Sequence, residues 1–183
     1  MNLFILDRNP VVAAQDQCDK HVVKMIVESA QMLSTVHRML DGFETRKPSV
    51  SGKTMAKYFE LPDDRENLLY KACHFNHPCT IWTRESMHNY RWHWQHFAAL
   101  CDEYTYRYGK KHSTDTKLRK ALEQLPDNIP VTKMTEFKLA MSSNPECMME
   151  CPVESYRAFY HTKQHRFKMD WTKRKVPEWF TYA

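Results

Sequence analysis

Residues 19–40 have the sequence DKHVVKMIVESAQMLSTVHRML, and this stretch sets the fold class. Apolar residues recur in it every three or four positions, which is the period of one helical face. These residues are Val22, Ile26, Ala30, Leu33, Val36 and Leu40. The stretch therefore predicts a long amphipathic helix with Asp19 as its N-cap, ended by Asp41-Gly42 with Gly42 in a left-handed cap.

A second strong helical pattern spans about Ser86 to Tyr108, with Gly109 after it. Its apolar stripe consists of Tyr90, Trp94, Phe97, Cys101, Tyr104 and Tyr108. Shorter helices are expected at about 10–17, 63–73, 116–125 and 152–161, and residues 133–151 are expected to be mostly loop. Leu3 to Leu6 predicts a short extended segment. The expected fold is mainly α, a compact single-domain helical bundle over 1–183 with that extended N-terminal segment.

The composition supports one folded domain. The chain has 183 residues, and a domain typically takes roughly 100–200. Hydrophobic residues make up 42% and aromatics 13%, which argues against disorder. The three glycines exclude a glycine-rich phosphate loop and disfavour a hairpin-rich fold. Residues from about 43 to 62 are basic and irregular, and we expect them to form a basic loop.

The charge balance suits a nucleic-acid partner. The formal net charge is +5, and basic clusters lie at 46–57, 110–120 and 163–175. Phe167 and Trp171 interleave the last cluster, a mixture that serves phosphate contact and base stacking. The alternative for each cluster is an ordinary solvated basic surface.

The first residues do not form a signal peptide, because a basic region and a small-residue cleavage site are missing. No apolar run approaches the roughly 20 residues of a membrane helix. We therefore expect a cytoplasmic protein with no membrane partner, and six reduced cysteines.

One polar row follows the first long helix. His21, Lys24, Glu28, Gln31, Thr35 and Arg38 are spaced 3, 4, 3, 4 and 3 residues apart. Helical geometry puts such residues on one face. The row offers His21 and Glu28 as a general acid/base pair. It also offers the amine of Lys24 and, in Arg38, a guanidinium that can bind an anion. The alternative is a solvated face with pairs such as Lys24–Glu28.

A second polar row follows the aromatic helix and consists of Asn89, His93, His96, Glu103 and Arg107. If the two helices pack antiparallel, both rows flank one cleft. Glu28 and Glu103 would then serve acid/base chemistry on a phosphorylated substrate.

Cys73, His74, His77 and Cys79 lie within seven residues and are the candidate metal ligands. Zinc sites often pair ligands at such short spacings, but these spacings match no standard finger. Buried cysteines more often behave as small apolar residues. The sequence therefore predicts no metal or cofactor, with zinc as the alternative.

The segment from Cys18 to Glu28 resembles the first helix of the phage-type pyrimidine-dimer DNA glycosylase/AP lyase family, where a His precedes the catalytic Glu by seven residues. His21 and Glu28 match that pair. The helix end Arg107-Tyr108-Gly109 and the later Pro177-Glu178-Trp179 are similar to further family features. The chain also resembles uncharacterised tailed-phage proteins. The resemblance implies a compact helical domain that binds duplex DNA and flips a base out of it. It also implies a phage-encoded protein that works in the cytoplasm of the host cell.

The chain departs from that family at three points. Val27 and Gln31 stand where the family has arginines near the catalytic Glu. The family's nucleophile is the α-amine of a Thr exposed by Met removal, whereas Asn2 is too large for efficient removal. The nucleophile must then be another amine: Lys20, Lys24 or the α-amine of Met1.

The leading hypothesis is a nucleic-acid-processing enzyme, of glycosylase/lyase or nuclease type, that acts on a flipped or single-stranded nucleotide and binds DNA. Its expected catalytic residues are His21, Lys24, Glu28 and Glu103. The expected phosphate-binding residues are Lys20, Arg38, Arg84, Arg91, Arg107, Lys110 and Lys111. The alternatives are an enzyme of a free nucleotide or other small anionic metabolite, and a non-catalytic phage binding or inhibitor protein.

Overall fold

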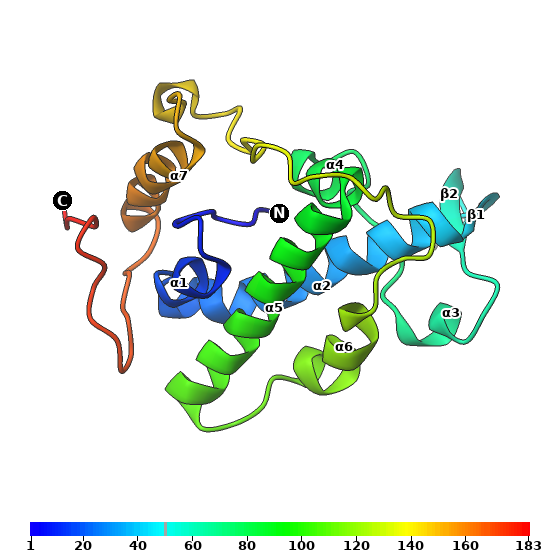
Figure 1. Cartoon of the computed structure of the whole chain (residues 1–183), viewed down its shortest axis with the longest axis horizontal. Coiled ribbons are helices and arrows are strands. Elements are labelled where there is room, and N and C mark those ends of the chain that lie inside the picture. Colours follow the sequence, from blue (N-terminus) through cyan, green and yellow to red (C-terminus); the bar gives the residue numbers. More distant parts are fainter. Residues whose placement is uncertain (50) are drawn as a thin grey trace.

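The computed structural model describes residues 1–49 and 51–183, which contain seven α-helices and one two-stranded sheet. The two longest helices, α2 (Asp19–Asp41) and α5 (Met87–Tyr108), cross at the centre of the molecule (Figure 1). The short helices α1 (Pro10–Gln15), α4 (Pro78–Glu85) and α6 (Ser113–Glu123) contact this pair. The helix α7 (Pro152–His161) and the C-terminus lie at the opposite end from the sheet. None of the described helices is long and apolar enough to cross a membrane.

The apolar stripe of α2 forms part of the core, as predicted. Val22, Ile26 and Leu33 are fully buried, and only Leu40 at the end of the stripe is partly exposed. The N-cap is Cys18 rather than Asp19. The Asp19 carboxylate instead accepts hydrogen bonds from Arg107 and Thr172, which tie the helix start to α5 and to the C-terminal segment.

The predicted left-handed cap at Gly42 was wrong, because its backbone is extended at φ −96° and ψ −175°. A glycine is required there for another reason. A Cβ at this position would lie 2.5 Å from both the Arg38 and the Glu60 carbonyl oxygens. Gly42 therefore lets the chain leave α2 directly into a strand, while Gly109 has the left-handed conformation expected after α5, at φ +69°.

The predicted basic loop at 43–62 is instead a β-hairpin. Strands β1 (Phe43–Pro48) and β2 (Met55–Glu60) pair antiparallel, from Phe43 opposite Glu60 to Pro48 opposite Met55. Most of their side chains are exposed, so the apolar alternation that marks a half-buried strand is missing. Ion pairs stabilise the hairpin, with Lys57 Nζ 2.8 Å from Glu44 and Lys47 Nζ 2.5 Å from Glu60.

The helix expected at 63–73 is only the single turn α3 (Arg65–Leu68). The buried guanidinium of Arg38 explains the early end, because it donates hydrogen bonds to carbonyl groups of this segment. Its Nε donates to the Tyr70 carbonyl at 2.7 Å and its Nη2 to the carbonyls of Glu66 and Leu69. Its Nη1 donates to the Glu66 carboxylate and to the Phe59 carbonyl of β2.

The other helix boundaries follow the sequence with small shifts. The helix α6 begins three residues earlier than expected, since the His112 side chain caps it by accepting from Thr114 N at 3.1 Å. The segment 133–151 is irregular apart from one 3₁₀ turn, Pro145–Cys147, and a second 3₁₀ turn, Thr162–His165, follows α7.

The polar row expected on α5 is buried, and it does not share a cleft with the polar row on α2. The His93 ring lies 2.8 Å from the Thr83 hydroxyl, and the His96 Nδ1 lies 3.0 Å from the Pro10 carbonyl. Asn89 donates to the Trp82 carbonyl at 2.7 Å. These polar side chains connect α5 to α4 and α1, because a helix at the centre of a fold is covered on both faces.

The extended N-terminal segment is part of the core. Residues from Leu3 to Leu6 are buried, and the Asn2 amide donates to the Ala140 carbonyl at 2.9 Å. Arg157 of α7 donates to the Leu6 carbonyl at 2.8 Å. The N-terminus therefore lies well inside the outline of the molecule, near α2 (Figure 1).

Arg38→Ala should destabilise the fold strongly, because it leaves the partly buried Glu66 carboxylate and several carbonyls without their donor. Breaking a buried ion pair costs about 3–5 kcal/mol. Urea unfolding of the variant and the wild type measures the loss. Lys71→Ala removes the exposed partner of the same carboxylate and should cost under about 1 kcal/mol. Equal losses for the two variants would contradict the structural role of Arg38.

Candidate functional site

A hollow of about 390 Å³ opens beside the chain start, between the N-terminal half of α2 and the segment that follows α7. Four of the residues predicted from the sequence line it, namely Lys20, His21, Lys24 and Glu28. Met1 lines it as well. We call this hollow the N-terminal pocket. It gathers one carboxylate, one imidazole and several amines in a small volume.

Glu28 is the centre of the polar contacts in this pocket. One carboxylate oxygen, Oε2, lies 3.7 Å from the α-amine of Met1 and accepts a hydrogen bond from the Asn2 backbone N–H at 3.1 Å. The other, Oε1, lies 3.1 Å from Lys24 Nζ. The Glu28 side chain is 13% exposed and that of Met1 only 4%, whereas Lys24 is 66% exposed. The carboxylate is thus held in place between the α-amine of Met1, whose side chain is buried, and a solvent-facing lysine amine.

His21 forms a neutral wall of the pocket. Its Nδ1 lies 2.7 Å from the Tyr160 hydroxyl, and its ring stacks on Phe4 with the centroids 4.5 Å apart. Burial, followed by the nearby charges of Lys24 and Lys163, lowers the pKa of its imidazole to about 3. An uncharged ring does not attract phosphate as a cation. At neutral pH the His21 ring is therefore an uncharged hydrogen-bonding group in the pocket wall.

Lys163 is a pocket residue that the sequence placed only in a basic cluster. Its Nζ lies 3.3 Å from the centroid of the Phe159 ring. Burial, followed by the charge of Arg166, lowers the pKa of its ammonium to about 8. A fraction of this amine is therefore unprotonated at neutral pH. The four-residue spacing between Phe159 and Lys163 at a helix end was the sequence feature that could have indicated their contact.

The segment 73–77 lies close to the N-terminal amine. The Thr35 hydroxyl donates to the Cys73 carbonyl and accepts from the Cys73 N–H, both at 3.1 Å. His77 caps α4 by accepting from Cys79 N at 3.2 Å. Burial lowers the pKa of His77, and the charge of the Met1 amine lowers it further.

The candidate metal ligands do not form a site in the described residues, where no group of three or more His, Cys, Asp or Glu side chains is arranged to hold a metal ion. Burial raises the pKa of the Cys79 thiol to about 11, so it is not a ready thiolate. His77 and Cys73 have the structural contacts given above, and His74 is exposed.

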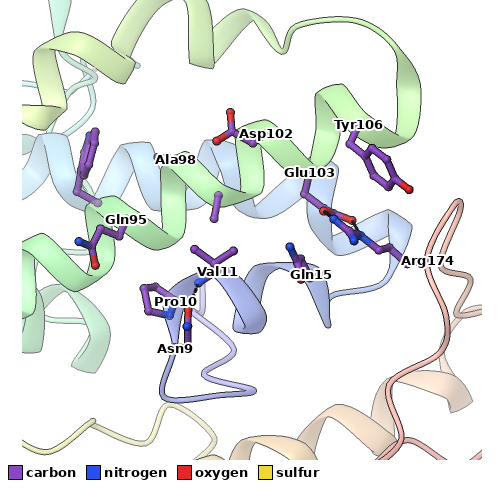
Figure 2. A pocket seen from close by; sticks show the side chains of 12 residues that line it. Asn9, Pro10, Val11, Gln15, Gln95, Ala98, Asp102, Glu103, Tyr106 and Arg174 are labelled. Carbon is purple, nitrogen blue, oxygen red and sulfur yellow. Dashed lines mark hydrogen bonds and ion pairs between the residues drawn. The ribbon is translucent and has the colours of Figure 1, made fainter.

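Glu103 lies apart from the N-terminal pocket and does not act with Glu28. Its carboxylate accepts from Arg107 Nε at 2.7 Å and from Arg174 Nη2 at 2.8 Å. Figure 2 shows Glu103 and Arg174 meeting at the edge of a larger hollow, about 690 Å³, between α1 and α5. Although this hollow is larger, its one buried carboxylate is already neutralised by two guanidinium groups. It therefore offers no free acid/base group.

The predicted phosphate-binding residues divide into buried and exposed groups. Arg38 and Arg107 have fully buried side chains with carboxylate partners, so their expected role as phosphate ligands is replaced by a structural one. Arg84 is partly buried and donates to the Phe75 carbonyl at 2.5 Å. The exposed members are Lys20, Arg91, Lys110 and Lys111.

Comparison of the chain with family models, with curated proteins and with solved structures gave no match.

The His21 ring should stay neutral far below the usual range of histidine. The unfolded chain binds this proton near pH 6.5 and the folded chain only near pH 3. The free energy of unfolding contributed by this group therefore falls as the pH drops through that window. NMR titration of the ring carbons measures the first effect. Denaturation between pH 3 and 7 measures the second, and His21→Gln should flatten the slope by about one proton. A ring that titrates near 6.5 would contradict this account.

Proposed function

We propose that the protein is a nucleic-acid-processing enzyme of the glycosylase/lyase type, with a compact helical-bundle fold, that acts on DNA at the N-terminal pocket. One observation carries the proposal: the α-amine of Met1 lies 3.7 Å from the Glu28 carboxylate inside a pocket with lysines around it. The resemblance of His21 and Glu28 to the phage-type glycosylase/lyase pair supports the same reaction class. An amine nucleophile beside a carboxylate is what imine chemistry needs.

The chemistry assigns one role to each group. The unprotonated amine attacks C1′ of the sugar, the bond from C1′ to the base breaks, and the base leaves with the electron pair and gains a proton from water. Glu28 accepts the proton that the amine loses. Glu28 returns this proton to O4′ as the C1′–O4′ bond breaks, which opens the sugar ring and leaves an iminium at C1′ whose positive charge the Glu28 carboxylate stabilises. Transfer of a proton from C2′ to Glu28 then forms the C2′=C3′ double bond as the C3′–O bond breaks, and the phosphate leaves with that electron pair.

The Met1 amine is the favoured nucleophile among the amines of the pocket. α-Amines as a class lose their proton at lower pH than lysine side chains in water. The buried Met1 side chain fixes the position of the α-amine 3.7 Å from Glu28, whereas the Lys24 side chain is 66% exposed. Lys163 is the second choice, because burial lowers its pKa to about 8.

In this proposal, other basic residues of the pocket take the place of the arginines found in the family that the chain resembles. Lys20, Lys24 and Arg166 line the pocket and would meet the phosphates on either side of an inserted nucleotide. Phe167, over which Lys20 Nζ lies at 4.8 Å from the ring centroid, would contact the sugar or a neighbouring base.

A second candidate is an enzyme of a free nucleotide, and the pocket size favours it. A hollow of about 390 Å³ is in the range of small-ligand sites, roughly 300–1,000 Å³. The same Glu28 and amine groups would then act on a mononucleotide, with the lysines holding its phosphate.

Borohydride should trap a covalent complex between the protein and duplex DNA that contains an abasic site. Glu28→Gln should lower the trapping rate by at least about 100-fold, the usual contribution of a positioned acid/base group, and leave DNA binding largely unchanged. Gel mobility after reduction measures trapping, and fluorescence anisotropy measures binding. Glu123→Gln, on an exposed part of α6, is the matched control and should behave as the wild type. An unchanged rate in Glu28→Gln would remove the catalytic role of this residue.

The attachment site distinguishes the amines. Peptide mass spectrometry of the trapped complex should place the adduct on Met1, and Lys24→Gln should still be trapped. An adduct on Lys163 would show that the Lys163 amine, and not the Met1 amine, is the nucleophile. Absence of any adduct, with DNA or with a mononucleotide, would favour the non-catalytic alternative.

Salt separates DNA from a free nucleotide as the substrate. DNA binding should weaken steeply with ionic strength, with the logarithm of affinity falling by about 0.9 per phosphate contact for each tenfold rise in salt. A shallow dependence, close to that of one or two charges, would favour a mononucleotide. Titrations from 50 to 400 mM salt measure the slope.

A further inference from the structure

The β1–β2 hairpin has a basic face that the proposed pocket chemistry does not use. Residues opposite one another in an antiparallel pair share a face. Arg46 lies opposite Lys57, and Pro48 lies opposite Met55 on the same face. Glu44, opposite Phe59, is on this face as well, so the face has two cations and one carboxylate. We call this side, with Glu44, Arg46, Met55, Lys57 and Phe59, the hairpin basic face.

The pairing of Arg46 with Lys57 points to an anionic partner. Like charges directly opposite in a sheet destabilise it. Lys57 has a counter-charge in Glu44 at 2.8 Å, but Arg46 has no ion pair within 4.0 Å in the part of the chain that the structure describes. An anion bound between the two cations would remove the repulsion. Because Glu44 already pairs with Lys57, Arg46 is the cation of this pair that is open to an anionic partner.

The aromatic neighbours of these cations match a sugar-phosphate backbone better than a bare anion. Lys57 Nζ lies 5.8 Å from the Phe59 ring centroid and 5.9 Å from that of Phe75. The two rings meet edge to face at 5.7 Å. Met55, 61% exposed, adds apolar surface to the same face. Cations with aromatic and apolar contact area between them are the mixture used to follow a nucleic-acid strand.

The hairpin basic face connects to the N-terminal pocket through the segment 73–77. Phe75 contacts Phe59 of the hairpin, and Arg84 holds the Phe75 carbonyl. Two residues further on, His77 lies close enough to the Met1 amine to feel its charge. Pocket and hairpin are therefore joined by one short segment that lies along α2.

The spacing between the two surfaces corresponds to part of a DNA duplex. Glu28 and Gly42 are 14 residues apart at the two ends of this stretch of α2, which is about 21 Å of helix. At 3.4 Å per base pair this length spans about 6 base pairs. The hairpin projects beyond the end of α2, away from α1 and α7 (Figure 1). A two-stranded ribbon of this kind fits against a DNA groove.

We propose that the hairpin basic face binds the phosphate backbone of duplex DNA at least about 6 base pairs to one side of the nucleotide held at the N-terminal pocket. This inference rests on the proposed function, because it takes the pocket as the place where the nucleotide is bound. Arg46 and Lys57 supply two phosphate contacts, so the complex depends on one flank of the DNA more than on the other.

The test combines a paired charge removal with one-sided shortening of the DNA. The variant is Arg46→Gln/Lys57→Gln, and its control is Lys133→Gln/Lys138→Gln, two exposed lysines outside the three basic clusters, with the same change of charge. The single change Arg46→Gln accompanies them, since it breaks no ion pair within the described residues. Binding to duplexes with an abasic site is measured by anisotropy as each flank is shortened from 12 to 3 base pairs, and thermal unfolding checks that every variant is folded.

The wild type should lose about tenfold in affinity when one particular flank falls below about 6 base pairs, and not when the other does. The hairpin variant should bind the long duplex as weakly as the wild type binds the shortened one. Its salt slope should be shallower by about 1.8, which corresponds to two lost phosphate contacts. The control variant should keep the flank dependence and most of the slope.

Borohydride trapping on the same duplexes keeps the two proposals apart. Suppose the wild type is trapped and the hairpin variant has the same affinity and the same salt dependence of binding as the wild type. That result would overturn the hairpin inference and leave the proposed function standing. Duplex binding that weakens in the hairpin variant without any trapping would support the hairpin surface and contradict the lyase chemistry. Absence of duplex binding by the wild type would overturn both.

Discussion

The buried guanidinium of Arg38 determines the structure around the C-terminal half of α2. A charge in the interior must have all of its donors satisfied. Arg38 meets that requirement with the Glu66 carboxylate and carbonyls of Phe59, Glu66, Leu69 and Tyr70. These contacts end α3 after one turn and attach β2 to α2. They also direct the following chain back along α2, where the segment 73–77 reaches the N-terminal amine.

A second buried guanidinium, that of Arg107, fixes the N-terminal end of α2 against α5 in a similar way. Arg107 joins Asp19, at the start of α2, to Glu103 on α5, and Arg174 from the C-terminal segment completes the group. Both ends of α2 are therefore fixed by ion pairs. The turns that carry His21, Lys24 and Glu28 lie between them and border a hollow instead of another helix. The polar row on α2 is thus divided into an N-terminal half that borders the pocket and a C-terminal part, Thr35 and Arg38, that makes structural contacts.

The sequence could predict the helices but not this division. Apolar spacing from Val22 to Val36 is a local signal, and it was sufficient for α2. The hairpin lacks such a signal, because its strands are exposed on both faces and Gly42 is needed only for close contact with Glu60. Glu28 and Glu103 are equivalent in pattern, each with a cation four residues away. Their difference arises from Met1 and Arg174, which lie 27 and 71 residues distant along the chain and approach them only in the fold.

The placement of Glu28 bears on the proposed chemistry, which passes through a cationic intermediate. A carboxylate that moves freely in water stabilises a nearby positive charge weakly, because solvent screens it and must reorganise. Glu28 instead is held through Oε2 by the Asn2 N–H and through Oε1 by Lys24, and the same Oε2 faces the Met1 amine. Its negative charge therefore has a fixed position in the folded chain. The Met1 amine lies on one side of this charge and the exposed Lys24 on the other, so in the proposed reaction the substrate would contact the amine and the carboxylate together. The same arrangement would be lost if the chain start were free, which is why the burial of Leu3 to Leu6 in the core belongs to the site as much as to the fold.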